Sequence, residues 1–143
     1  MKPIKITLDT NIWFSIAMGG KIGSRIPSIL NNPNIHLFHC KETNYEFDDI
    51  TGRPKNQKFV SDERRINTKI LIENFTTLVP ILSPIVLISR DPKDDHLLAL
   101  SKDYNLDYLV TGDKDLLVLK TYGNTKICTF ADFVIEIENL KLI

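Results

Sequence analysis

The sequence has few cysteines and no long apolar run. Its two cysteines, Cys40 and Cys128, follow neither Cys-x-x-Cys nor Cys/His zinc spacing, so we expect buried, reduced thiols. The longest apolar stretch, residues 78–89, is interrupted by Pro80 and Pro84 and is too short to span a bilayer. The N-terminus lacks the apolar core of a signal peptide. These absences predict a soluble, cytoplasmic protein with no membrane partner.

An excess of charge of one sign is also missing. Eighteen basic residues balance eighteen acidic ones, so any footprint for nucleic acid must be local. Neither a glycine-rich phosphate loop nor a Gly-x-Ser-x-Gly nucleophile elbow occurs, which argues against nucleotide-binding and serine-hydrolase classes. The histidines show no ligand spacing: we expect His36 and His39 to be structural residues on a strand and His96 to lie on a helix surface.

What the sequence does contain is an alternation of short β-like runs with longer helical patterns. Its 143 residues, 43% hydrophobic, suffice for a single domain over residues 1–143 with a proper core. The expected strands are residues 4–9, 35–40, 85–89, 107–111 and 126–130. The expected helices are residues 12–18, 24–30, 41–51, 62–78, 94–103, 113–119 and 131–140. This alternation predicts an α/β fold of three layers, α/β/α, around a central, mainly parallel five-stranded sheet.

Acidic side chains follow three of the predicted strands. Asp9 ends the first, Asp94 and Asp95 follow the third, and Asp113 and Asp115 follow the fourth. The carboxyl ends of parallel strands meet at one edge of the sheet, where ligands bind in such folds. Carboxylates gathered there repel one another, and a divalent cation removes that penalty. Because carboxylate oxygens suit hard cations, the pattern predicts a Mg²⁺ or Mn²⁺ site.

Each aspartate also has a local explanation. Asp9 and Asp113 suit the N-cap position of a helix. Asp94 and Asp95 lie at a helix start, where the helix dipole favours negative charge. Asp115 is expected to face the first turn of a short helix and to border the site. The convergence of all of them on one edge favours a functional cluster over three independent caps.

Four segments together resemble a known family. LDTNIWFS at residues 8–15 is similar to an opening strand followed by an Asp-Thr-Asn signature, and KICTFADFV at 126–134 fits a closing strand and helix. RDPKDDHLLALSKDYNLDYLVTGDKDLL at 90–117 is the most specific block. CKETNYEFDDITGRPK at 40–55 is similar to a segment whose helix carries an acidic residue and ends in Arg-Pro. With these segments the chain resembles PIN domains, the fold of many metal-dependent ribonucleases, and most of all the toxins of type II toxin–antitoxin pairs.

The resemblance implies roles for individual residues. It makes Asp9, Asp95 and Asp113 catalytic metal ligands. Glu46 matches the second acidic position, six residues after Cys40, where the family usually has serine, and would assist the metal or the attacking water. Competitors of Glu46 on the same helix are Glu42, Asp48 and Asp49. The residues that would support or border the site are Asn11, Thr111, Asp94 and Asp115.

Basic side chains accompany the acidic ones. Lys93 and Lys114 are interleaved with the aspartates. A local basic region contains Arg53, Lys55, Lys58, Arg64 and Arg65. This region either tracks an RNA backbone, chiefly through Arg53 and Lys55, or is a solvated helical face. Trp13 is a candidate for stacking an RNA base, whereas Phe14 is expected in the core.

The resemblance implies a metal-dependent endoribonuclease that hydrolyses phosphodiester bonds of single-stranded RNA as the toxin of a toxin–antitoxin pair. A cognate antitoxin protein and a homodimer are its expected partners. The alternative is a catalytically weak PIN module that acts by binding RNA or protein. Two other α/β classes fit less well. A phospho-acceptor receiver domain needs an acidic pair at the first strand, where Asp9 is single, and a dehalogenase-type phosphatase needs aspartate in place of Asn11.

Overall fold

This computed structural model describes residues 2–84 and 95–142. Its fold is α/β, with a central sheet that is mainly parallel. In this part of the chain six strands follow the order β3-β2-β1-β4-β6-β5. Their bounds are β1 (Ile4–Leu8), β2 (Ile35–His39), β3 (Thr77–Leu78), β4 (Tyr108–Val110), β5 (Thr121–Tyr122) and β6 (Thr125–Cys128). Of the pairings, β5–β6 is antiparallel and the others are parallel. The predicted fold class is confirmed.

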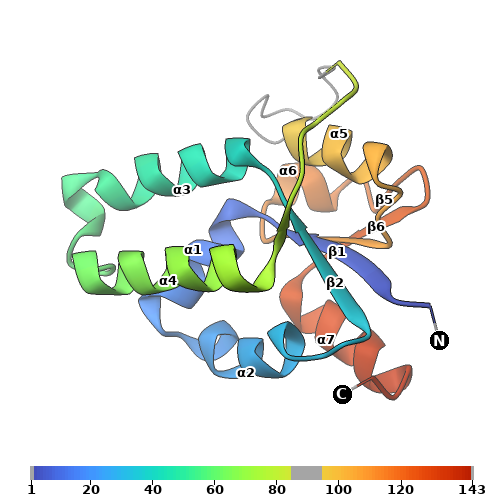
Figure 1. The fold of residues 1–143 in the computed structure, drawn as a ribbon, viewed down its shortest axis with the longest axis horizontal. Helices are drawn as coiled ribbons and strands as arrows, with labels where there is room; N and C mark the ends of the chain where they lie inside the picture. The colour runs from blue at the N-terminus through green and yellow to red at the C-terminus, as the bar shows by residue number, and fades with distance from the viewer. Residues whose placement is uncertain (1, 85–94, 143) are drawn as a thin grey trace.

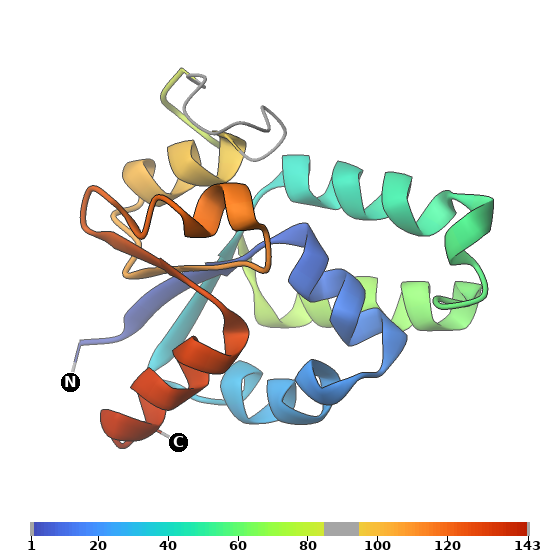
Figure 2. The same cartoon turned by 180° about the vertical axis from the view of Figure 1, so that it is seen from behind.

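Helices cover both faces of the sheet. They are α1 (Thr10–Met18), α2 (Lys21–Leu30), α3 (Lys41–Gly52), α4 (Asp62–Phe75), α5 (Asp95–Asp103), α6 (Lys114–Leu117) and α7 (Phe130–Asn139), with a short 3₁₀ helix, η1 (Pro54–Asn56). Figures 1 and 2 show α3 and α4 extending to one side of the sheet, with α1 packed against both. Within the ranges that the structure describes, none of these helices is both long and apolar enough to cross a bilayer.

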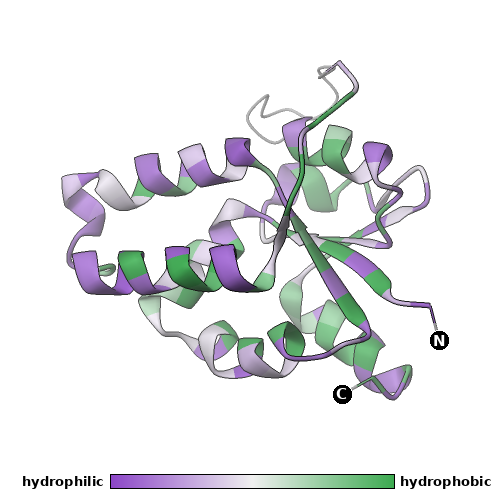
Figure 3. Ribbon diagram, in the orientation of Figure 1, coloured by the Kyte–Doolittle hydropathy of each residue, from purple (hydrophilic) through white to green (hydrophobic). Residues whose placement is uncertain are grey.

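The two faces of the sheet have separate apolar clusters, because successive residues of a strand point to opposite sides. On β4, Leu109 packs with Leu98 of α5 and Leu116 of α6. Its neighbour Val110 belongs to the larger cluster, which includes Trp13 of α1. Figure 3 shows apolar residues concentrated in the central strands and in α5 and α7, whereas α3 is mostly hydrophilic. The three-layer arrangement follows from this alternation.

The strand count differs from the five expected. The predicted strand at residues 85–89 lies outside the described residues. The predicted helix 62–78 is too long: α4 ends at Phe75, and Thr76 is already extended, with φ −119° and ψ 155°. The β-branched pair Thr76-Thr77 is unfavourable in a helix, and Pro80 follows closely. The chain therefore leaves the helix and adds β3 beside β2.

The second unpredicted strand is β5. It forms a hairpin with β6 through the two residues Gly123 and Asn124. Gly123 has a φ of +58°, a conformation that favours glycine and suits the tight turns of two-residue hairpins. The Gly-Asn pair was therefore a turn signal, and two strand residues before it were too few to produce a visible periodicity.

Candidate active site

Asp9 connects the end of β1 to the end of β4. Its carboxylate is 2% exposed and caps α1, with Oδ1 accepting a hydrogen bond from the backbone N of Thr10 at 2.6 Å. Oδ2 accepts a second bond from Thr111 Oγ1 at 2.7 Å. Nearby, the backbone N of Gly112 donates to Asn11 Oδ1 at 3.2 Å. The cap interpretation of Asp9 is correct, but the same carboxylate also contacts a distant strand. These hydrogen bonds offset part of the cost of burying its charge.

Thr111 links two of the predicted acidic residues. It is fully buried, and its hydroxyl both donates to Asp9 and accepts a bond from the backbone N of Asp113 at 3.0 Å. The Asp113 carboxylate caps α6, because its Oδ1 accepts from the backbone N of Asp115 at 2.9 Å. Asp9, Thr111 and Asp113 therefore form one hydrogen-bonded unit at the carboxyl ends of β1 and β4, which we call the strand-end unit.

His96 connects α5 to α3. Asp95 and His96 open α5 and are 1% and 6% exposed. His96 Nε2 lies 3.4 Å from Glu46 Oε1 and 3.4 Å from Thr43 Oγ1. The expectation that His96 lies on a helix surface is wrong, because α5 is buried continuously from Asp95 to Ser101. His96 thus lies next to the predicted site residue Glu46, a contact that no local sequence pattern indicated.

The other acidic residues of α3 differ in their surroundings. Asp48 Oδ1 lies 2.7 Å from Lys69 Nζ, and Asp49 Oδ2 lies 2.6 Å from Arg53 Nη2. Glu42 Oε1 is buried and has no hydrogen-bond partner in the part of the chain that the structure describes. The two aspartates are therefore engaged by cations, whereas Glu46 is the acidic residue of α3 that contacts α5, through His96.

His39 and Trp13 pack together in the core. The ring of Trp13 is fully buried and meets the ring of His39 edge-on, with centroids 5.9 Å apart. His39 Nε2 lies 2.7 Å from Asn44 Oδ1, and burial lowers the pKa of His39. His39 is accordingly a core residue of β2. The interpretation of Trp13 as an RNA-stacking platform is wrong, because α1 turns this side chain toward the sheet.

The predicted nucleic-acid-binding residues lie in separate places. Lys114 is exposed at the start of α6, beside the strand-end unit. Arg53 follows α3 and is held by its ion pair with Asp49, and Lys55 is exposed in η1. Two further residues predicted for the site lie outside the described residues: Lys93 and Asp94.

Across residues 2–84 and 95–142, no group of three His, Cys, Asp or Glu side chains lies close enough together to hold a metal ion. Asp9 and Asp113 are joined through Thr111, whereas Asp95 lies beside the contact between His96 and Glu46. The donor chemistry of Asp9, Asp95 and Asp113 nevertheless suits a hard divalent cation, since these three side chains end in carboxylate oxygens.

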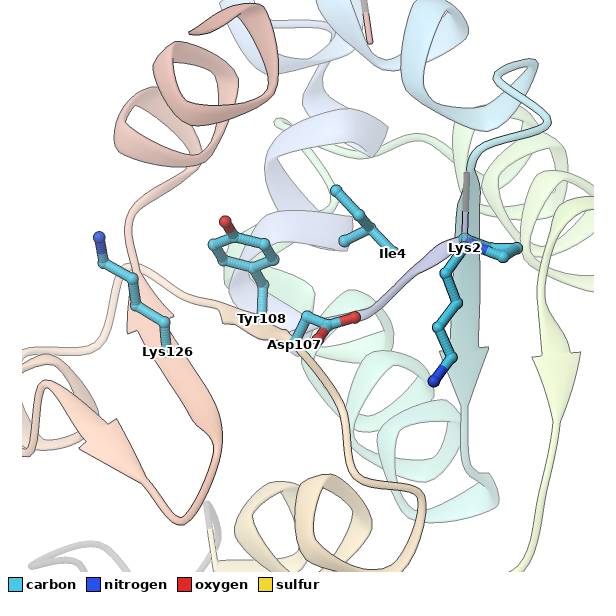
Figure 4. A pocket seen from close by; sticks show the side chains of 6 residues that line it. Lys2, Ile4, Asp107, Tyr108 and Lys126 are labelled. Carbon is cyan, nitrogen blue, oxygen red and sulfur yellow. The ribbon is translucent and has the colours of Figure 1, made fainter. Parts of the chain in front are cut away.

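One surface cavity lies far from the strand-end unit, and another borders it. The first, of about 330 Å³, lies at the starts of β1, β4 and β6, and its lining includes Lys2, Tyr108 and Lys126 (Figure 4). It is therefore at the opposite edge of the sheet from the strand-end unit. A second hollow, of about 510 Å³, borders Thr111 and Gly112 and is lined largely by apolar residues of α1, α2 and α7.

Comparisons with known proteins agree with this architecture. The sequence matches a family model described as PIN domain over residues 5–115, a range that contains the four predicted catalytic residues. A solved structure with a similar fold is that of VapBC2 from Rickettsia felis bound to a DNA fragment from their promoter. Its TM-score is 0.60 at 12% sequence identity, and the match covers 87% of this chain and 97% of that chain. The search of curated proteins found no match.

Proposed function

This chain belongs to the PIN domain family, and from that premise we propose that it is a metal-dependent endoribonuclease acting on single-stranded RNA. PIN domains are generally nucleases, which supports hydrolase activity. The observation that carries the proposal is the strand-end unit of Asp9, Thr111 and Asp113. It lies at the carboxyl edge of a parallel sheet, where α/β folds bind their ligands.

We propose Asp9, Asp95 and Asp113 as the residues that hold a Mg²⁺ or Mn²⁺ ion. Such an ion, once bound, activates water for attack and offsets the negative charge that develops on the phosphate. Two of these carboxylates are buried, where an added positive charge stabilises them most. The three carboxylates come from the starts of three helices, α1, α5 and α6, so replacing any one of them should weaken metal binding, which makes metal affinity a direct test.

The remaining residues of the site orient these groups. The Thr111 hydroxyl holds the Asp9 carboxylate and the Asp113 backbone in a fixed relation, so that both strand ends present their oxygens together. Glu46 is the proposed residue that accepts a proton from the attacking water, and its contact with His96 limits the positions that its carboxylate takes. Asn11 ties the first turn of α1 to Gly112.

A protein partner and a toxin role belong to the same proposal. The apolar hollow beside Thr111 and Gly112 offers a surface on which a cognate antitoxin would cover the site.

A second copy of the chain is the other expected partner, and Ile66 and Ile70, about half exposed on α4, supply apolar surface for it. Light scattering and co-expression with the product of a neighbouring small gene would test these partners. We propose a cytoplasmic location, because the RNA substrate is found there.

The test is cleavage of labelled single-stranded RNA by the purified protein, with Mn²⁺ or with EDTA, and with single-stranded DNA of the same sequence as comparator. We expect cleavage of RNA with Mn²⁺, its loss in EDTA, and a decrease of at least about 100-fold in Asp113→Asn, in line with the loss of an electrostatic catalytic group. Asp132→Asn, a change in the first turn of α7, is the matched control.

Two results would contradict the proposal: cleavage that persists in EDTA, or full activity of Asp113→Asn. RNA binding without any cleavage, in the presence of bound metal, would favour the alternative of a PIN module that acts by binding.

A further inference from the structure

An exposed aromatic ring lies inside the local basic region. Phe59, between η1 and α4, is 50% exposed. Lys58 Nζ lies 5.0 Å from the centroid of its ring, a cation–π distance. Exposing an aromatic ring to water is unfavourable. In contrast to Phe59, Trp13 is fully buried in the core. Proteins that bind single strands use aromatic rings together with neighbouring cations to stack bases.

The ring borders a hollow of about 440 Å³ whose lining is mixed in character. The lining residues are Met18, Gln57, Lys58, Phe59, Ser61 and Arg64. Arg64 Nη1 donates a hydrogen bond to the backbone O of Met18, so the start of α4 is tied to the end of α1. A Cβ atom at Gly19 would lie 2.7 Å from the same Nη1, so glycine at this position leaves room for the guanidinium. The hollow thus combines an aromatic face, two cations and polar side chains.

The local charge is positive although the chain as a whole is neutral. Between residues 49 and 65 there are five basic residues and three acidic ones, a net charge of +2, whereas the whole chain has a net charge of 0. Part of this charge is balanced, because Arg53 pairs with Asp49. Lys58 and Arg64, at the hollow itself, are the cations placed to meet phosphates.

The hollow lies at the end of α1, one helix length from the strand-end unit at its start. Helix α1 begins at its cap, Asp9, and ends at Met18, which lines the hollow. Its nine residues span about 13 Å at 1.5 Å per residue, roughly the length of four stacked nucleotides at 3.4 Å each. Figures 1 and 2 show α1, α3 and the start of α4 on the same side of the sheet.

We propose that Phe59, with Lys58 and Arg64, forms a subsite that stacks one base of single-stranded RNA and binds its neighbouring phosphates. The proposal rests on the ribonuclease function proposed above and extends it to a second point of contact. Single-strand binders combine aromatic stacking with cations in this way and have little sequence preference. Gln57 and Ser61 supply polar groups for the edge of the base.

The test measures affinity rather than activity. Binding of a fluorescent single-stranded RNA of about ten nucleotides is titrated in EDTA, so that cleavage plays no part. We expect Phe59→Ala to raise the Kd roughly tenfold, the loss of one stacked base, and Phe59→Trp to retain or improve binding. Phe75→Ala is the matched control, since Phe75 is 40% exposed on α4. Arg64→Gln is expected to lower the salt dependence of binding.

The outcomes separate this subsite from the proposed function. If the wild-type protein cleaves RNA with Mn²⁺ and Phe59→Ala binds RNA as tightly as wild type, the subsite is wrong and the nuclease stands. If neither protein cleaves but Phe59→Ala binds more weakly, the subsite stands and the nuclease fails. Equal loss of affinity in Phe59→Ala and Phe75→Ala would also overturn the subsite, because it would indicate a general effect of removing surface aromatics.

Discussion

Thr111 Oγ1 donates a hydrogen bond of 2.7 Å to Asp9 Oδ2, although the two residues are 102 positions apart in the chain. The bond is buried, and the same hydroxyl accepts from the backbone of Asp113. One side chain therefore joins the first strand to the loop that follows the fourth. This relationship fixes how the two strand ends of the proposed site lie relative to each other.

The variant Thr111→Val has the same shape but no hydroxyl. It removes one hydrogen bond from Asp9 Oδ2 and one from the backbone N of Asp113, so we expect the free energy of unfolding to fall by about 1–3 kcal/mol. Urea denaturation measures this loss, and RNA cleavage should fall with it even at temperatures where the variant is folded. Thr111→Ser retains the hydroxyl and should recover most of both properties. Equal behaviour of the two variants would show that the hydroxyl does not matter.

His96 is predicted to position Glu46. His96→Leu removes the nitrogen that lies 3.4 Å from Glu46 Oε1 and keeps an apolar side chain in the buried site. We expect kcat for RNA cleavage to fall about tenfold, less than the roughly 100-fold or greater contribution of a general base, because Glu46 itself is retained. KM should change little. His96→Gln restores a hydrogen-bond donor and should recover part of kcat. A change in KM alone, or no difference between the two variants, would contradict a positioning role.

Stability should decrease in mild acid because of His39. Burial lowers its pKa in the folded state, so the folded protein favours the neutral ring. The resulting stabilisation is complete above the ordinary histidine pKa of about 6.5 and is lost as the pH falls below it. Urea denaturation between pH 7 and pH 5 should therefore show a declining free energy of unfolding. The decline should be smaller in His39→Gln. His36→Gln, an exposed position on the same strand, should leave it unchanged.

A second loss of stability is expected in alkali. Burial is the main cause that raises the pKa of the Cys128 thiol from 9.0 to about 12 and that of Tyr108 from 10.0 to about 12. The folded state thus favours the neutral forms, and this stabilisation is complete below pH 9 and is lost as the pH rises toward 12. Cys128→Ala should show a shallower decline on denaturation at pH 7 to 10. A decline as steep as that of wild type would mean that this thiol is not responsible.

The location of the acidic residues was readable from the sequence, because their positions depend on local rules. Asp9 and Asp113 each follow an apolar run, and parallel strands bring such ends to one edge. Thr111 and Asn11 were identified only through the resemblance to PIN domains. The predicted segments were least accurate at β3 and β5, since strands of two residues have no periodicity of their own.

The side chains around this edge depended on contacts that no local pattern encodes. His96 is buried and lies against Glu46 of α3, and Trp13 is buried against His39 of β2. Phe59 is exposed although its residue type predicts burial. The sequence by itself determined most of the helices and longer strands, and the edge of the sheet at which the aspartates lie. The tertiary structure alone decided which side chains are buried or exposed, since that depends on the packing of segments distant in the chain.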